Sequence, residues 1–214
     1  MGNWPIVNNH LSIRPEVEEL LRLTGIQDWD SKCSQIAYDL QGDFGRALKN
    51  LLELDRSIPG LGQHNVNERA LDGHLTGVYN HEDRPIFRGI QYVGMHLNTD
   101  KPEWYTRMIV TESCYHVEGC LKRKTGITGN LSVGMILNEI KGRTTLADDL
   151  VTALWHLNRA IYNNAKHTIE FIEMDGHMFS IADCIAIYLA CRVIGARLLN
   201  GLGITTKHGE LLFP

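Results

Sequence analysis

The chain has 214 residues, of which 43% are hydrophobic and 21% are charged, and its formal net charge is −4. These values are typical of a soluble globular protein and exclude intrinsic disorder as the main state, because there is ample apolar side chain to bury. The charge balance also gives no reason to expect strong non-specific binding to nucleic acid. The length suits one compact domain.

The cysteines and the apolar segments indicate a compartment. Five cysteines are present and none form a Cys-x-x-Cys pair, so neither a disulfide framework nor a zinc ribbon is expected. The N-terminal residues show no apolar stretch of the kind found in a signal peptide. The most apolar segment, residues 178–194, is interrupted by Asp183 and Arg192 and is too short to span a bilayer. We therefore expect a protein of the reducing cytoplasm with no membrane partner.

Helices are predicted over residues 1–60. Pro15, followed by acidic residues, begins a first helix, and Gly25 ends it. A second helical stretch begins near Asp30, is broken by Gly42 and Gly45, and stops at residues 57–60.

Residues 61–99 are predicted to be irregular or partly extended, because glycines recur through them and the apolar pattern is weak. A short helix over 68–75 fits part of this segment. Residues 86–97 fit a strand or an extended loop, and the sequence does not decide between the two.

From residue 100 onward the pattern predicts a core helical bundle over 100–200, followed by a tail over 201–214. Helices are expected over 102–124, 131–141, 145–174 and 180–199, with capping signals at Asp100, Thr145 and Ser180. A row of alanines in the last helix favours close approach by another helix. The predicted fold class is therefore predominantly all-α, in one compact domain overall.

A polar stripe on the predicted helix 145–174 carries the functional hypothesis. Its members follow one another at intervals of three or four residues and so share one side of a helix: His156, Arg159, Asn163, His167 and Glu170. Asn and His are poor helix formers, and a plain solvent-facing surface would normally use Glu, Lys and Gln. The stripe fits a phosphate-binding or catalytic surface, and it equally fits a hydrogen-bonded polar seam between helices that binds no ligand.

Metal-independent phosphodiester cleavage is a reaction that these residue types support. Arg159 would bind a phosphate and stabilise the developing charge. His167 would take a proton from a ribose 2′-hydroxyl or give one to the leaving oxygen. Asn163 would orient His167 or contact the phosphate. No cofactor is expected.

The segment LNRAIYNNAKH, residues 157–167, resembles the Arg…His helix of HEPN domains. These are four- or five-helix bundles, many of them metal-independent ribonucleases or RNA-binding parts of toxin and defence systems. The resemblance implies catalytic roles for Arg159 and His167 with Asn163 as a polar helper at the catalytic site, an RNA partner, and a homodimer whose two sites meet. We also expect His156 and Lys166 to contact the substrate. On a regular α-helix Arg159 and His167 would be about 80° apart, on one side.

Two alternatives remain open. The predicted helix 102–124 places Glu112, His116 and Cys120 at intervals of four residues, and with a histidine from the next helix they could ligate a metal in a metal-dependent enzyme. The chain could instead be a non-enzymatic interaction protein, in which the apolar last helix packs against a partner or a second copy.

Overall fold

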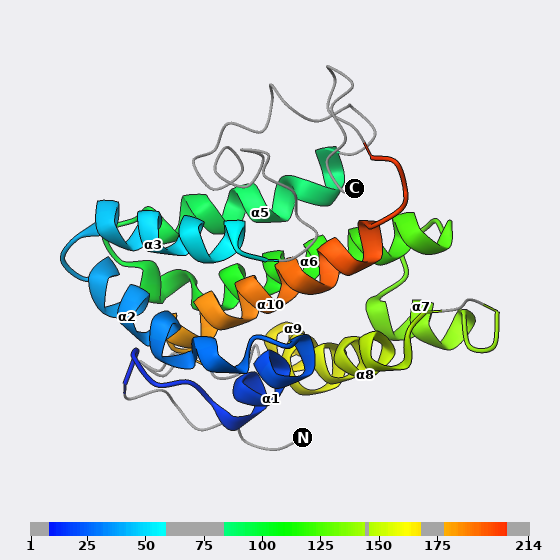
Figure 1. Ribbon diagram of the computed structural model, residues 1–214, viewed down its shortest axis with the longest axis horizontal. Helices are drawn as coiled ribbons and strands as arrows, with labels where there is room; N and C mark the ends of the chain where they lie inside the picture. The colour runs from blue at the N-terminus through cyan, green and yellow to red at the C-terminus, as the bar shows by residue number, and fades with distance from the viewer. Residues whose placement is uncertain (1–8, 59–83, 144–145, 168–177, 205–214) are drawn as a thin grey trace.

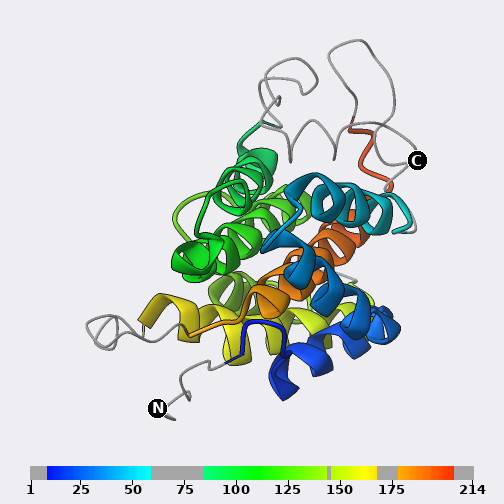
Figure 2. The ribbon, with the colours of Figure 1, turned by 90° about the vertical axis from the view of Figure 1, so that its left-hand side faces the viewer.

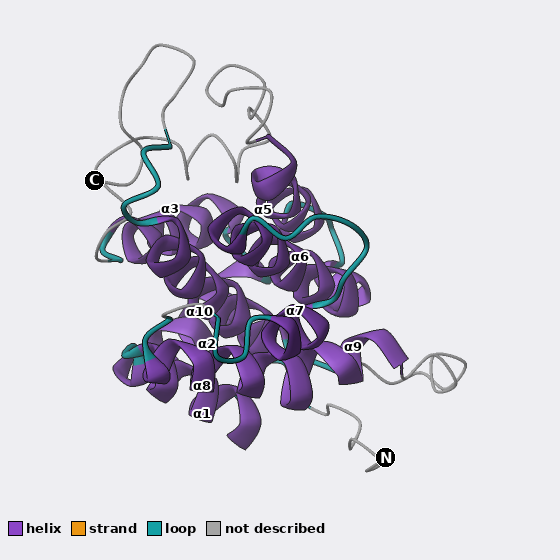
Figure 3. Cartoon of the chain, turned by 90° about the vertical axis from the view of Figure 1, so that its right-hand side faces the viewer, coloured by secondary structure: helices purple, strands orange, loops and turns teal. Residues whose placement is uncertain are grey.

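The computed structural model describes residues 9–58, 84–143, 146–167 and 178–204. Over these ranges the chain forms helices and loops and no strand (Figure 3), which confirms the predicted all-α class. In chain order the helices are α1 (Pro15–Thr24), η1 (Gln27–Trp29), α2 (Asp30–Leu40), α3 (Phe44–Arg56), α5 (Arg84–Leu97), η3 (Pro102–Tyr105), α6 (Thr106–Thr125), α7 (Val133–Glu139), α8 (Asp148–His156), η4 (Leu157–Tyr162), α9 (Asn163–His167) and α10 (Ile181–Leu199).

Helix α10 is the centre of the bundle. It packs against α6, α2 and α1 and also meets α3 and α8, with α5 and α6 on one side and α1, α8 and α9 on the other (Figures 1 and 2). Every residue of α10 except Arg197 is buried. The apolar circumference of this helix is therefore covered by the chain itself, and it is not the surface of a dimer.

The start of α10 is fixed by the capping box that the sequence predicts. The Ser180 hydroxyl accepts from the Asp183 backbone N–H at 2.8 Å, and the Asp183 carboxylate accepts from the Ser180 N–H at 3.0 Å. Asp183 also binds the Arg14 side chain at 3.3 Å, just before α1. The same carboxylate thus caps α10 and holds the N-terminal part of the chain against it.

The N-terminal helices follow the predicted pattern with one difference. Gly25, at φ 80°, ends α1 in the left-handed conformation that glycine adopts most readily. Gly45, predicted to break a helix, instead lies in the first turn of α3, where Asp43 caps the Arg46 N–H at 3.0 Å. One capped turn outweighs the low helix propensity of a single glycine.

Residues 84–97 form a helix, so the prediction of a strand or extended loop over 86–97 was wrong. Its buried side follows the helical interval: Ile86, Phe87, Ile90, Val93 and Leu97. Gly89 is one of the recurring glycines of this segment, and it lets α5 lie close to α6, since an added Cβ would be 2.4 Å from the Glu112 carbonyl oxygen. The short helix predicted over 68–75 lies outside the described residues.

The predicted helix 145–174 is present over its described part, but it is not uniform. It runs as α8, then as the π-helical η4, then as α9. No side-chain cap forms at its start, where Ala147 is the N-cap residue. Likewise Asp100 does not cap the helix that follows it, which opens as the 3₁₀ turn η3 and continues as α6. Residues 168–174 lie outside the described ranges.

Within the described ranges, none of the helices combines the length and the apolar character that crossing a membrane requires.

Candidate functional site

The predicted polar stripe divides between two environments. His156 Nε2 donates to the Glu16 carbonyl oxygen of α1 at 2.7 Å, so this imidazole joins two helices. Arg159 and Asn163 are exposed, and the Arg159 guanidinium lies 4.3 Å from the centre of the Trp155 ring. The polar-seam interpretation therefore holds for His156 and is wrong for Arg159 and Asn163.

The π-helical segment changes the phase between Arg159 and His167. A π-helix pairs residue i with i+5 and turns less per residue than an α-helix. On a regular α-helix, the eight residues from Arg159 to His167 rotate by more than two full turns. A smaller rotation per residue brings the total angle closer to two full turns. The two backbone positions are thus closer to one line along the helix than the regular value of about 80°. The side chain of His167 is outside the described part.

Lys166 lies against two tyrosines. Its Nζ is 3.7 Å from the ring centre of Tyr162 and 5.8 Å from that of Tyr115, and the two rings meet edge to face at 5.9 Å. Arg107 of α6 donates to the carbonyls of Ala165 and Lys166, which holds the end of α9 in place. Burial lowers the pKa of Lys166, because a desolvated ammonium is less stable than a hydrated one.

Glu118 of α6 lines a pocket, and its charge acts on Lys166. It accepts from Lys122 at 2.9 Å and from the Tyr162 hydroxyl at 3.3 Å. Burial, followed by the nearby Glu118 charge, raises the pKa of Tyr162, so this phenol keeps its proton. Sequence inspection could not group Tyr115, Tyr162 and Glu118, because they come from two helices that only the fold brings together.

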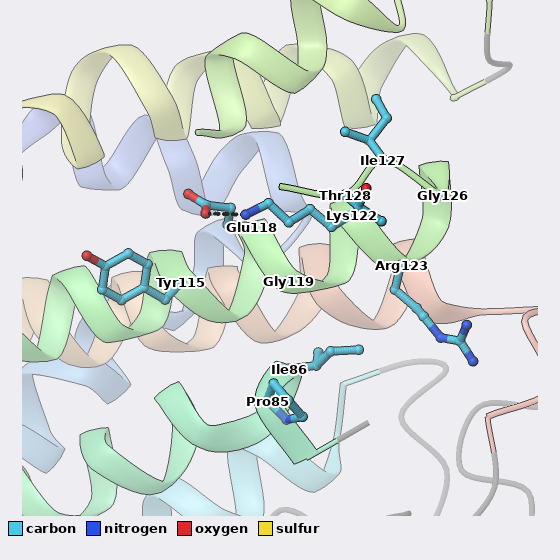
Figure 4. Close-up of a pocket in the computed structure, with 10 residues that line it drawn as sticks. All are labelled: Pro85, Ile86, Tyr115, Glu118, Gly119, Lys122, Arg123, Gly126, Ile127 and Thr128. Carbon is cyan, nitrogen blue, oxygen red and sulfur yellow. Dashed lines mark hydrogen bonds and ion pairs between the residues drawn. The ribbon is translucent and has the colours of Figure 1, made fainter. Parts of the chain in front are cut away.

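The pocket itself has a volume of about 500 Å³ and lies over α6 (Figure 4). Gly119 of α6 and Pro85 and Ile86 of α5 belong to its lining. The other lining residues are Tyr115, Glu118, Lys122, Arg123, Gly126, Ile127 and Thr128. In Figure 4 the Lys122 ammonium reaches toward Glu118, whereas Arg123 extends away from that ion pair. Aromatic, apolar and cationic side chains thus share one hollow with the Glu118 carboxylate, which pairs with Lys122.

The alternative metal site does not form among the described residues, where no cluster of three or more His, Cys, Asp or Glu side chains could hold a metal ion. His116 is buried, and both of its ring nitrogens are engaged: Nδ1 donates to the Ile86 carbonyl at 2.8 Å, and Nε2 accepts from Arg192 at 3.3 Å. Cys120 Sγ lies 3.7 Å from the same Nε2. Glu112 is half-buried, and burial raises its pKa.

The five cysteines of the chain are buried free thiols: Cys33, Cys114, Cys120, Cys184 and Cys191. Burial raises the pKa of Cys33 to about 12 and raises those of Cys120, Cys184 and Cys191 as well. A thiol that stays protonated is a poor nucleophile, and Cys184 and Cys191 are fully buried core residues of α10.

No protein-family profile, curated protein or solved structure matches the chain. The resemblance to HEPN domains therefore stays a prediction.

Proposed function

We propose that this chain binds single-stranded RNA along the exposed side of α8, η4 and α9. The observation that carries the proposal is the row of Trp155, Arg159 and Asn163, spaced four residues apart, in which a guanidinium covers an indole and two polar groups face solvent. A buried seam would have hidden Arg159 and Asn163, and both are exposed.

The chemistry of this row suits an unpaired nucleotide. Aromatic rings and guanidinium planes stack on exposed bases, at about 1–3 kcal/mol per base. The guanidinium of Arg159 also offers paired donors to a phosphate, and the Asn163 amide can donate to and accept from a base edge. Because Trp155 holds the guanidinium in one orientation, less side-chain entropy is lost on binding.

Binding should be modest and sensitive to salt. The chain has a net charge of −4, so it has no general attraction for a polyanion, and only the few cations near this row contribute. Each phosphate contact to a single strand releases about 0.7 of a counterion. The measurement therefore belongs at low ionic strength.

A direct test is fluorescence anisotropy with labelled single-stranded RNA of mixed sequence. Arg159→Gln should weaken binding by about 1 kcal/mol or more, roughly fivefold in Kd. Arg22→Gln is the matched control, because Arg22 is also exposed on a helix and pairs with Glu19 at 2.6 Å. Equal affinities for the two variants, or no binding at low salt, would reject the proposal and favour a helical interaction protein without RNA.

Metal-independent cleavage is the second candidate, favoured by the π-helical phase that brings the Arg159 and His167 positions toward one line. His167→Ala and Arg159→Ala should each lower cleavage by about 10²–10⁴-fold, and Asn163→Ala should lower it less. A chelator should change nothing. Wild-type protein that binds RNA without cutting it would reject catalysis and keep binding.

The dimer implied by the HEPN resemblance also remains a proposal. With α10 in the interior, a second copy would have to meet the η4–α9 side. Light scattering at micromolar concentration gives the mass directly, and a single 24.2 kDa species would remove this part of the proposal.

A further inference from the structure

A second pocket, of about 480 Å³, lies where α2 ends and where η3 and α10 begin. Apolar and polar side chains share its lining: Ala37, Leu40, Pro102, Ile181, His10, Gln41, Asp100, Glu103 and Trp104. These residues come from four separate parts of the chain, so the pocket exists only in the folded protein. It is distinct from the pocket over α6 and from the Trp155–Arg159–Asn163 row.

The charged side chains of this lining are acidic. Asp100 and Glu103 each contribute a carboxylate, and apart from His10 the lining has no side chain that can carry a positive charge. Within the described part of the chain, neither carboxylate has an ion-pair or hydrogen-bond partner. Both carboxylates can therefore pair with a cation that enters the pocket.

Two further features of the lining favour positive charge. The last turn of α2 contributes Ala37, Leu40 and the C-cap residue Gln41, and this turn contains no basic side chain. Because the C-terminus of a helix carries partial negative charge, it stabilises a nearby cation. Trp104 is 67% exposed, and its ring already accepts a cation, since the Lys101 Nζ lies 4.5 Å from the ring centre.

We infer that this pocket binds a small organic cation, namely a protonated primary or secondary amine with a short apolar chain. The ammonium group pairs with Asp100 and Glu103 and lies against the Trp104 ring, and the apolar chain covers the apolar part of the lining. The carboxylates and the Gln41 amide oxygen accept hydrogen bonds, so an ammonium with N–H groups fits better than a quaternary one. A metal ion fits less well, since the described residues hold no group of three or more potential metal ligands.

The test is a titration of the full chain with n-butylammonium, followed by ¹H–¹⁵N NMR at the indole N–H of Trp104. The Trp104→Phe variant assigns this signal. At a pH of about 8 an alkyl amine is protonated and an ordinary imidazole is neutral, and constant ionic strength keeps the screening equal. The signal should shift and saturate, with an affinity roughly tenfold above that for n-butanol, which has the same chain and no charge. Tetramethylammonium, which has no N–H group, should also bind more weakly.

Substitutions in and beside the lining locate the site. Asp100→Asn and Glu103→Gln should each weaken n-butylammonium binding roughly two- to fivefold, the range for an exposed ion pair, and the double variant should weaken it further. Lys101→Gln should strengthen binding, because it removes a cation that competes for the Trp104 ring. Affinity that is unchanged in the double variant overturns the role of the carboxylates.

Asp28→Asn is the matched control. Asp28 is exposed and precedes Trp29, whose ring also has a lysine near it, Lys32 at 5.6 Å, but none of these three residues lines the pocket. This variant should leave the response at Trp104 unchanged. If Asp28→Asn weakens binding as much as Asp100→Asn, the attraction comes from the net charge of the chain, and the pocket is overturned as the site. Equal affinities for n-butylammonium and n-butanol overturn the cationic ligand, and tighter binding of tetramethylammonium overturns the preference for N–H groups.

Discussion

The imidazole of His116 is neutral because one of its ring nitrogens must donate a hydrogen bond and the other must accept one. The Ile86 carbonyl can only accept, so Nδ1 carries the hydrogen, and the guanidinium of Arg192 can only donate, so Nε2 carries none. Burial and then the Arg192 charge lower the pKa of His116 to about 3. A histidine that sequence inspection places on a possible metal-binding side is thus a structural acceptor for a buried cation.

Acid should destabilise the protein through this residue. The unfolded chain binds a proton at His116 near pH 6.5 and the folded chain only near pH 3, so stability falls as pH decreases through that window. Between pH 6.5 and 5 the loss from His116 alone should be about 2 kcal/mol. Urea unfolding at both pH values measures it. In His116→Gln, whose amide can still donate and accept, this part of the pH dependence should vanish; an unchanged slope would contradict the assignment.

The ion pair behind His116 is fully buried. Arg192 Nε lies 3.1 Å from Asp55 Oδ1, and both side chains have almost no exposed surface. Burial raises the pKa of Asp55, and the charge and hydrogen bond of Arg192 oppose that rise. The pair joins α3 to α10, residues far apart in the sequence.

Removing one partner of this ion pair should lower the free energy of unfolding more than removing both partners. Arg192→Met alone leaves the Asp55 carboxyl buried without its cation, at about 3–5 kcal/mol. Arg192→Met combined with Asp55→Leu removes both charges and should be less destabilising than the single change. Chemical denaturation of the wild type and the two variants tests the order, and a double variant weaker than Arg192→Met would contradict it.

At the scale of elements, α6 and α10 lie close together because of a glycine. A Cβ at Gly195 would be 2.5 Å from His116 Nε2 and 3.3 Å from Cys120 Sγ. The alanine row identified in the sequence is buried on the same helix, at Ala182, Ala186 and Ala190. Small side chains along α10 thus decide how near its neighbours come.

Gly195→Ala should therefore destabilise the protein by about 1–3 kcal/mol through overpacking. Gly45→Ala is the matched control in another helix, because its Cβ would meet only Asp43 Oδ1, at an ordinary 3.6 Å. That variant should be unchanged or up to about 1 kcal/mol more stable. Thermal unfolding compares them, and equal melting temperatures would show that α6 can shift to make room.

Helices with strong end signals could be predicted from the sequence, and those shaped by packing could not. Gly25 and Ser180 mark real helix ends, since caps act within one turn. Helix α5 was missed because Gly89 and Gly94 resemble breaks, while the neighbour that requires Gly89 lies on α6. The π-helical segment η4 and the Tyr115–Tyr162–Lys166 contact depend on tertiary structure in the same way. The order of the polar residues along the stripe could therefore be predicted, but the side chains that contact them could not.

At the scale of the whole molecule, the N-terminal helices and the later helices share one core. Residues 100–200 were expected to form the bundle, but α1, α2 and α3 cover α10 directly. The backbone N–H of Ala182 donates to the His10 carbonyl at 3.0 Å, and Asp183 pairs with Arg14. The apolar surface of α10 is thus buried within one chain. If the protein is an interaction protein, its contact surface is not this helix.

A fragment that begins at residue 84 should therefore fail to fold cooperatively. It keeps α5 to α10 but exposes the side of α10 that α1 and α2 cover, and it takes Asp55 away from Arg192. Loss of that carboxylate alone costs about 3–5 kcal/mol, against a total stability of about 5–15 kcal/mol for a domain. Circular dichroism on heating compares the fragment with the full chain, which should unfold in one step. A sharp transition in the fragment would show that residues 84–214 form a domain of their own. That outcome would agree with the sequence pattern, which predicts a core bundle over residues 100–200 alone.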